Sequence, residues 1–236
     1  MPTVTTITTI ATAPDRTALL RLLQLASPTL PVGAYAYSQG LEYAVHAGWV
    51  ADEGDARDWI LGLLEHNLAN LDIPVLARLL EAWQQGDRAD VLRWTRFLWA
   101  GRESAELRAE DRALGVALAR LLADLGVAEA RSWAGADLAT YATLFALAAV
   151  AWKIPPTDAA AGYLWAWCEN QVAAAIKLVP LGQTAGQRIL CLCAERIPAL
   201  AARGLSLGES HIGSAAPGVA IASARHETQY TRLFRS

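Results

Sequence analysis

The amino-acid sequence predicts an all-α fold: a single domain of about nine or ten helices around one central apolar helix. Apolar residues recur at the spacing of an amphipathic helix along nearly the whole chain. No stretch alternates between apolar and polar residues as a half-buried strand would, and no unit of roughly 30–45 residues repeats. The 236 residues are enough for one sizeable core, and no linker is long enough to separate two domains.

Six helices are expected in the first half of the chain, and several begin at a side chain that can cap a helix N-terminus. Asp15 and Asp72 each stand before a run of apolar residues at helical spacing, and Asp52 and Asp55 lie together in the N-terminal turn of another helix. A stretch rich in Pro, SPTLPVGAY, follows the first helix, and Gly48 and Gly86 stand where two later helices end. The expected ranges are 15–27, 38–47, 52–71, 72–85, 87–101 and 104–125.

Four helices are expected in the second half, and the first of them is apolar on nearly all sides. The stretch YATLFALAAVAW, residues 141–152, therefore belongs at the centre of the fold. The next helix has Asp158 as its cap and ends at Pro180, whereas Pro198 should kink or end the helix after that. The expected ranges are 136–153, 154–180, 181–204 and 219–227, with a Gly- and Ser-rich loop before the last.

Composition and charge exclude several classes of protein. Apolar residues make up 54% of the chain and charged residues 18%, as in a folded globular protein. The net charge of −3 and the lack of a Lys/Arg run argue against a nucleic-acid partner, and residues 141–152 are too few to span a bilayer. The three cysteines are an odd number without a secretory signal, so we expect a cytoplasmic protein with no membrane association. Residues 1–14 are interpreted as a loose, Thr-rich arm.

No catalytic or metal-binding motif is recognisable. None of the four histidines pairs with another at ligand spacing, and neither a phosphate-binding loop nor a nucleophile elbow is present. Cys191 and Cys193 are two residues apart on an expected helix and so point to different sides, as buried small hydrophobes would; a soft-metal pair requires the helix to open. We therefore expect a protein without enzyme activity, without a cofactor and without a tight metal site of its own.

Two internal stretches contain more polar groups than a helical core requires. In LPVGAYAYSQGLE, a loop-to-helix junction gathers polar side chains that serve either partner contact or local structure. In ENQVAAAIKLVPLGQTAGQR, polar side chains flank a Pro-Leu-Gly turn that should bring them together, either as a solvated stripe or as a cluster that binds a partner. The candidate residues are Tyr37, Ser38, Gln39 and Glu42 in the first stretch, and Lys177, Gln183, Gln187 and Arg188 in the second.

The chain ends in RHETQYTRLFRS, residues 225–236, which follows the expected helical domain at 15–224. Ordering such a tail costs about 12–24 kcal/mol of backbone entropy, at about 1–2 kcal/mol per residue. Burial of Tyr230, Leu233 and Phe234, which are spaced to form one helical stripe, returns only about 1.5–3 kcal/mol each. The tail therefore needs a surface rich in hydrogen bonds, either on the body of the protein or on another protein.

These stretches together resemble one known family. LLRLLQLASPTLPVGAYAYSQGLEYAVHAGWV (residues 19–50), ENQVAAAIKLVPLGQTAGQRIL (169–190) and the tail RHETQYTRLFRS are similar to the urease accessory protein family UreF, and ELRAEDRALG (106–115) also fits. The resemblance covers nearly the whole chain, with long motifs in the family's order. Ala34 and Ala36 differ mildly, and the Thr-rich arm has no counterpart.

The resemblance implies an all-α protein with no enzymatic activity of its own. UreF proteins bind the accessory protein UreD, called UreH in some species, and the pair recruits the GTPase UreG. The assembly delivers nickel to apo-urease. Within it UreF is often a homodimer, and its C-terminal segment is loose alone and ordered against UreD. The resemblance therefore implies that residues 225–236 bind a partner.

Carried over by position, the resemblance also implies roles for single residues. Arg232, Phe234 and Arg235 fall in the terminal motif and are assigned to the interface with UreD and to the recruitment of UreG. Together with Phe234, Tyr230 and Leu233 are expected to fill a groove on the partner. The second internal stretch is expected to meet UreG or to line a passage for nickel.

Three other functions compete with this reading. A GTPase-activating protein for UreG would use Arg188 or Arg235 as an arginine finger. A direct nickel carrier would need clustered ligands, which the scattered histidines do not provide. An independent helical hydrolase would need a triad or a metal site, and neither pattern is present.

Overall fold

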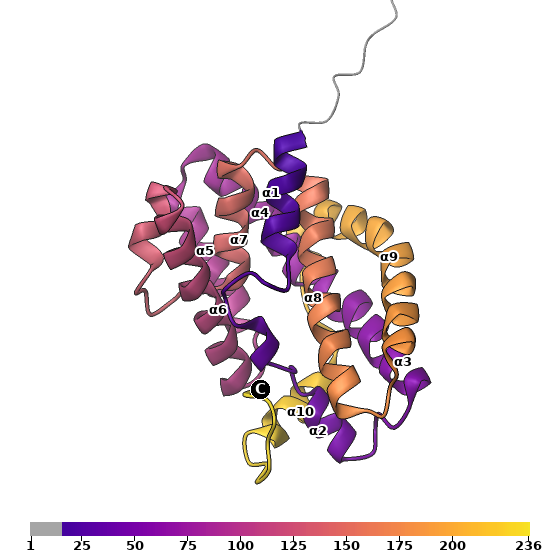
Figure 1. Cartoon of the computed structure of the whole chain (residues 1–236). Helices are drawn as coiled ribbons and strands as arrows, with labels where there is room; N and C mark the ends of the chain where they lie inside the picture. Colours follow the sequence, from indigo (N-terminus) through magenta and orange to yellow (C-terminus); the bar gives the residue numbers. More distant parts are fainter. Residues whose placement is uncertain (1–15) are drawn as a thin grey trace, which may run out of the picture.

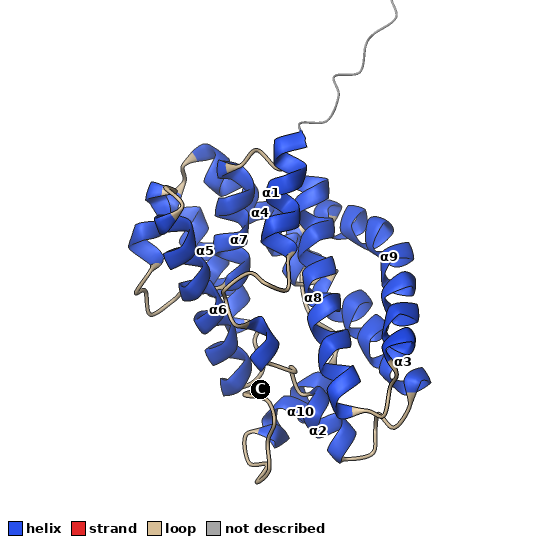
Figure 2. Ribbon diagram, viewed as in Figure 1, coloured by secondary structure: helices blue, strands red, loops and turns tan. Residues whose placement is uncertain are grey.

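The structure, a computed structural model, describes residues 16–236 and confirms the all-α fold (Figures 1 and 2). The predicted arm at 1–14 lies outside the described residues. Within 16–236 the chain forms ten α-helices and no strand, and none of these helices is long and apolar enough to cross a bilayer. The helices are α1 (Arg16–Ala26), α2 (Leu41–His46), α3 (Glu53–Leu63), α4 (Asp72–Gln85), α5 (Arg88–Ala100), α6 (Ala105–Asp124), α7 (Tyr141–Ala151), α8 (Pro156–Leu178), α9 (Gln183–Ser206) and α10 (Pro217–His226).

Helix α7 occupies the core, as its apolar sequence predicts. Every residue from 142 to 149 is buried, and α4 and α6 pack against the helix. The helix begins later than expected because the Thr140 side chain caps it by accepting a hydrogen bond from the backbone N–H of Thr143. Helix α6 can lie close to this cap because Gly115 has no side chain: a Cβ there would come within 2.8 Å of the Thr140 carbonyl carbon.

Two long helices, α8 and α9, form an antiparallel pair beside the core, and α1 packs along α8 (Figure 1). Pro198 lies inside α9 and does not end it, since the helix runs on to Ser206 and curves along its length (Figure 1). Pro198 has no N–H to donate to the preceding turn, which favours bending at this point. The alternative that Pro198 would end the helix is therefore wrong.

The helix expected at 52–71 is interrupted. Asp52 and Asp55 lie at the N-terminus of α3 as predicted, where Asp52 caps the helix by accepting from the Asp55 N–H at 3.0 Å. The helix passes into a π-helical turn, η2 (Leu64–Leu68), before α4 begins. Asp72 does not cap α4, because Leu71 occupies the cap position and the Asp72 side chain is buried among other helices. The prediction of Asp72 as a cap is wrong, because its carboxylate forms an ion pair with Arg102 in the interior.

Helices α2 and α10 lie side by side at one end of the molecule, close to α6 (Figure 1). Gly40 lies in this contact with φ 81°, and a Cβ there would come within 3.0 Å of the Ser223 backbone N. Helix α10 reaches His226, two residues beyond the predicted end of the helical domain at 224. The remaining residues 227–236, here called the C-terminal segment, are not helical and return toward α2 and α6.

Candidate functional site

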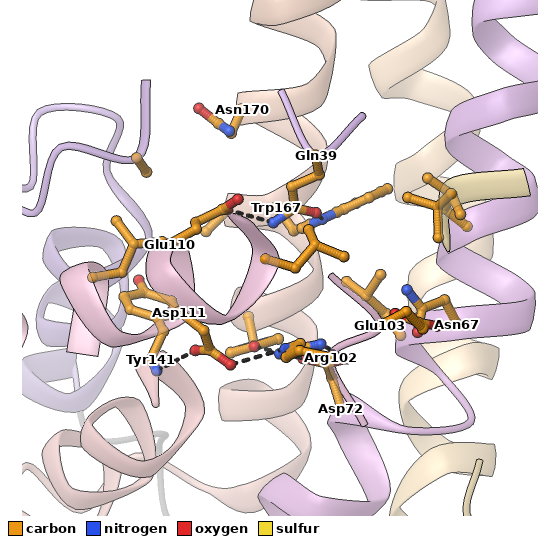
Figure 3. Close-up of a pocket in the computed structure, with 18 residues that line it drawn as sticks. Gln39, Asn67, Asp72, Arg102, Glu103, Glu110, Asp111, Tyr141, Trp167 and Asn170 are labelled. Carbon is orange, nitrogen blue, oxygen red and sulfur yellow. Dashed lines mark hydrogen bonds and ion pairs between the residues drawn. The ribbon is translucent and has the colours of Figure 1, made fainter. Parts of the chain in front are cut away.

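A buried ion network joins α4, α6 and α8. Arg102, in the loop before α6, donates to both carboxylate oxygens of Asp72 at 2.6 and 3.0 Å and to Asp111 at 2.8 Å (Figure 3). The Tyr163 hydroxyl donates to Asp72 at 2.9 Å, and the Tyr141 backbone N–H donates to Asp111 at 2.6 Å. Burial disfavours the charge on Arg102, but the two carboxylates hold the pKa of its guanidinium well above the usual range.

A cavity of about 100 Å³ adjoins this network, and its wall includes Gln39 and Glu110 (Figure 3). Gln39 donates from Nε2 to Glu110 at 2.7 Å and accepts through Oε1 from the Trp167 indole N–H at 2.7 Å. Its backbone has φ 54°, in the left-handed region, just before Gly40. The turn into α2 therefore places the Gln39 side chain between α6 and α8.

Glu110 is a buried carboxyl group in this wall with a raised pKa. Its side chain is on α6 and the residue is only 3% exposed. Burial raises the pKa of its carboxyl group to about 7, although hydrogen bonds from Ser236 and Gln39 act in the opposite direction. A carboxyl group that exchanges its proton near neutral pH therefore lies between the cavity and the end of the chain.

The last residues of the chain bind to the body of the protein. The Ser236 hydroxyl lies 2.6 Å from Glu110 Oε2, and the Ser236 O atom accepts from both the backbone N–H and the hydroxyl of Ser38. The Arg235 N–H donates to the carbonyl of Ala36 at 2.8 Å, and the side chain of Phe234 is buried. The C-terminal segment is therefore held by the start of α2, the residues before it, and α6.

Glu42, in the first turn of α2, binds the backbone of this segment. Its carboxylate accepts from the backbone N–H groups of Leu233 at 2.6 Å and Phe234 at 2.8 Å. The same carboxylate meets Nε2 of His226 at 3.1 Å. Glu42 is 7% exposed, so these contacts lie mostly out of reach of water, where charge-assisted hydrogen bonds are strong.

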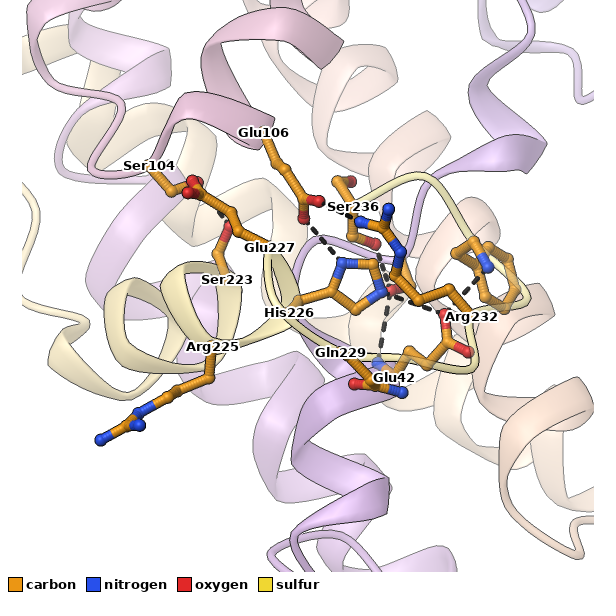
Figure 4. A network of polar contacts seen from close by, with 12 residues as sticks. Glu42, Ser104, Glu106, Ser223, Arg225, His226, Glu227, Gln229, Arg232 and Ser236 are labelled. Atoms are coloured by element: carbon orange, nitrogen blue, oxygen red, sulfur yellow. Dashed lines mark hydrogen bonds and ion pairs between the residues drawn. The ribbon is translucent and has the colours of Figure 1, made fainter.

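His226 connects three parts of the chain through one ring (Figure 4). The ring is fully buried, with Nε2 facing Glu42 of α2 and Nδ1 at 2.6 Å from Glu106 of α6. Glu106 also accepts from the Arg232 guanidinium at 2.6 Å. The end of α10 and the C-terminal segment are thus fixed by carboxylates from two different helices.

The four candidates of the first motif all face the protein interior. Ser38, Gln39 and Glu42 hold the C-terminal segment and the cavity wall as described, and the carbonyl of Tyr37 accepts from the Asn170 side chain at 3.1 Å. These contacts are the ones expected if the four residues serve local structure. That the same residues also contact a partner stays a prediction. The exposed aromatic of this stretch is Tyr35, at 70%.

The terminal motif does not form the expected helical stripe. Tyr230 is fully exposed and Leu233 is 65% exposed, whereas Phe234 is buried. The three side chains diverge because the segment is irregular after His226. Of the two surfaces proposed for this segment, the body of the protein provides one, since backbone hydrogen bonds to Glu42 and Ala36 hold the segment there. Binding of the segment to another protein stays a prediction.

The residues around the Pro-Leu-Gly turn do not converge. Arg188 donates to both carboxylate oxygens of Glu53 on α3, at 2.8 and 2.6 Å. Lys177 instead places Nζ 5.6 Å from the ring centroid of Phe234. The side chains of Gln183 and Gln187 are exposed and make no hydrogen bond within residues 16–236. The prediction of one polar cluster is wrong, because successive positions on α8 and α9 point to different neighbours.

Replacement of Lys177 by alanine is expected to lower the free energy of unfolding by no more than about 1 kcal/mol. The side chain is exposed, and a cation–π contact at such a site contributes about 0.5–1 kcal/mol. Urea unfolding followed by circular dichroism measures the change. Lys177→Met, which keeps the apolar stem and removes the charge, separates the two contributions; a loss above 2 kcal/mol in either variant contradicts the assignment.

Several residues of this site were not predicted from the sequence. The motif ELRAEDRALG contains Glu106, Glu110 and Asp111, but nothing in its pattern tells which helix faces them. The buried His226 was indistinguishable from an ordinary structural histidine. What distinguishes these residues is that they are charged and lie on the inward face of an amphipathic helix. Which face is inward can be told only when the orientation of the helix is known.

Metal ligands are not gathered in this site. Within residues 16–236 no three His, Cys, Asp or Glu side chains are grouped so as to hold a metal ion. Cys191 is exposed and Cys193 is buried, so the two point to different sides of α9 as their spacing predicts. The expectation that the chain has no tight nickel site of its own stays a prediction.

Known proteins that are similar to this chain along most of its length all have the same family name. The family model UreF matches residues 50–194. A urease accessory protein UreF of Alkalilimnicola ehrlichii is 58% identical over 216 residues, covering 92% of this chain and 95% of that protein. Similar proteins of the same name from an Azoarcus species and from Teredinibacter turnerae are 53% and 50% identical, each over 223 residues and 92% of this chain, with 95% and 98% of those proteins covered.

Proposed function

This chain belongs to the UreF family of urease accessory proteins, and from that membership we propose that it is a non-catalytic subunit of the urease maturation complex. In this proposal it binds UreD (UreH) in the cytoplasm as a homodimer and recruits the GTPase UreG, and the assembly inserts nickel into apo-urease. The observation that carries the proposal is identity of 58% along 92% of the chain to a urease accessory protein UreF.

The C-terminal segment supports a partner-binding role through the side chains that it leaves exposed. Its backbone is fixed by Glu42 and Ala36, while Tyr230 and Leu233 point into solvent. Large apolar side chains on a fixed backbone lose little conformational entropy when a partner covers them. They also lie in a segment with two arginines, and aromatic residues with arginine are typical of binding hot spots.

Replacement of Tyr230 and Leu233 together by serine is expected to weaken binding of UreD by at least about tenfold. Burial of one large apolar side chain contributes about 1.5–3 kcal/mol, and both side chains are available to a partner. Co-purification with tagged UreD, followed by titration of the purified pair with UreG, measures the effect. The free energy of unfolding of the isolated chain should change by less than about 0.5 kcal/mol.

The matched control is Leu125→Ser, which removes a 44% exposed leucine at the end of α6. The control should bind UreD as the unchanged chain does. If the double variant also binds normally, the C-terminal segment is not the UreD surface. If the unchanged chain binds neither UreD nor UreG, the proposed function itself is wrong. UreG turnover in the same samples tests the GTPase-activating alternative, for which Arg188 and Arg235 are the candidates. Both are exposed, and Arg188 is paired with Glu53.

A further inference from the structure

Two of the three cysteines meet in the interior of the antiparallel pair α8 and α9. Cys168 lies ten residues before Leu178, the last residue of α8, and Cys193 lies ten residues after Gln183, the first residue of α9. Because the two helices are antiparallel neighbours joined by a short turn, equal distances from that turn place the two cysteines at the same level (Figure 1). Both cysteines are fully buried.

The close packing of Gly186 shows which faces of the two helices meet. A Cβ at Gly186 would come within 2.6 Å of Ile176 Cδ1 and 3.1 Å of Val172 Cγ1, so this face of α9 lies directly on α8. Cys193 is two turns farther along the same face of α9, and Cys168 is one turn from Val172 on the same face of α8. The thiols of Cys168 and Cys193 accordingly form a hydrogen bond with each other.

We propose that Cys168 and Cys193 are a site of reversible oxidation, at which hydrogen peroxide joins the two thiols into a disulfide between α8 and α9. The bond closes a loop of chain that contains the whole Pro-Leu-Gly turn and the polar side chains on both sides of it. The inference concerns the chain by itself and does not rest on the proposed function.

The hydrogen bond between the thiols gives them different roles. Hydrogen bonding to Cys168 lowers the pKa of Cys193, whereas the same hydrogen bond and burial raise the pKa of Cys168. The reason is that the S–H of Cys168 stabilises the thiolate of Cys193, and the thiolate is the form that reacts with peroxides. Cys193 is therefore the attacking group, and Cys168 is the thiol that completes the disulfide.

The reaction balances in two steps. The thiolate sulfur of Cys193 attacks one oxygen of hydrogen peroxide, the O–O bond breaks, and a sulfenic acid and hydroxide form; the hydroxide takes the proton of Cys168 and becomes water. The Cys168 sulfur then attacks the sulfenic sulfur, the S–S bond forms and the S–O bond breaks. The second hydroxide leaves as water with the proton that Cys193 had released, so two thiols are oxidised and one peroxide is reduced to two waters.

The peroxide must reach a buried pair, and α9 is the helix that can open. Its outer face is exposed to solvent at Cys191 and Leu192, so one layer of helix separates the pair from water. Pro198 lies five residues beyond Cys193 and has no N–H to donate to the carbonyl of Ala194, which weakens the helix close to the pair. Local opening of α9 therefore admits a small oxidant without global unfolding.

Peptide mapping without reduction tests the proposal on the folded chain. The reduced chain is treated with hydrogen peroxide, the remaining thiols are blocked with N-ethylmaleimide, and the chain is digested with trypsin. We expect a disulfide that joins peptide 154–177, through Cys168, to Cys193 of peptide 189–196, with N-ethylmaleimide on Cys191. Dithiothreitol should return both thiols.

Cys191→Ser is the matched control, because it removes a thiol from the same helix and leaves the pair intact. This variant should lose the Cys168 thiol to peroxide at the rate of the unchanged chain, within about twofold, whereas Cys193→Ala should lose it at least about tenfold more slowly, since the attacking group is absent. Circular dichroism checks that each variant is folded. If Cys193→Ala does not fold, the mapped disulfide in the unchanged chain and in Cys191→Ser decides.

Oxidation that leaves Cys168 and Cys193 as thiols overturns the proposal, whether it falls on Cys191 within one chain or joins two chains through Cys191. A Cys168–Cys193 disulfide that forms only after urea has unfolded the chain overturns it as well. Both results would show that the two buried thiols act only as small apolar side chains in the packing of α8 and α9.

Discussion

Replacement of Arg102 by alanine is expected to lower the free energy of unfolding by about 3–5 kcal/mol. Removal of one member of a buried ion pair leaves its partner as an uncompensated buried charge, and that loss is typically of this size. Here two partners lose their counter-charge, because Asp72 and Asp111 are 2% and 5% exposed and both bind the same guanidinium. The loss of stability comes from the buried contacts between α4, α6 and α8 and not from the surface.

Urea unfolding at neutral pH measures this loss. Arg93→Ala is the matched control, because Arg93 also contacts two carboxylates, those of Asp90 and Glu209, but its side chain is 54% exposed. The control should lose no more than about 1 kcal/mol, as exposed ion pairs do. A triple replacement, Arg102→Met with Asp72→Asn and Asp111→Asn, should recover part of the stability. An Arg102→Ala chain as stable as the control contradicts the assignment.

Most of the helices were predictable because their signals are local. Asp residues at helix starts and the spacing of leucines lie within one or two turns of the residues that they order, as with Asp52 before α3. The failures occurred where a distant partner determines the conformation. Asp72 has the form of a cap in the sequence, but Arg102 and Tyr163 bind its carboxylate in the interior.

The site was less predictable than the fold because its contacts join residues far apart in the chain. Glu42 binds Leu233 across a separation of 191 residues, and no local pattern in either stretch specifies the other. The estimate for the tail counted only burial of apolar side chains. It omitted hydrogen bonds from backbone N–H groups to a buried carboxylate, which contribute about 1.5–3 kcal/mol each.

Replacement of Glu42 by alanine is expected to release the C-terminal segment. The carboxylate accepts from the backbone N–H groups of Leu233 and Phe234, so its removal leaves two donors without their acceptor, and the ring of His226 loses its contact with α2. Loss of even two charge-assisted hydrogen bonds corresponds to at least about a hundredfold shift toward the released form. The helix content should change little, because residues 227–236 are not helical.

The functional consequence of this release is the sharper test. If the bound segment presents Tyr230 and Leu233 to UreD in a fixed arrangement, then Glu42→Ala must weaken UreD binding, because the partner has to order the segment again. We expect a loss of at least about tenfold in Glu42→Ala, a smaller loss in Glu42→Gln, which keeps one acceptor oxygen, and none in the exposed Glu195→Ala. Titration of tagged UreD with each folded variant gives these values. Tighter binding by Glu42→Ala would show instead that UreD takes up the released segment, and that the contacts to Glu42 compete with assembly.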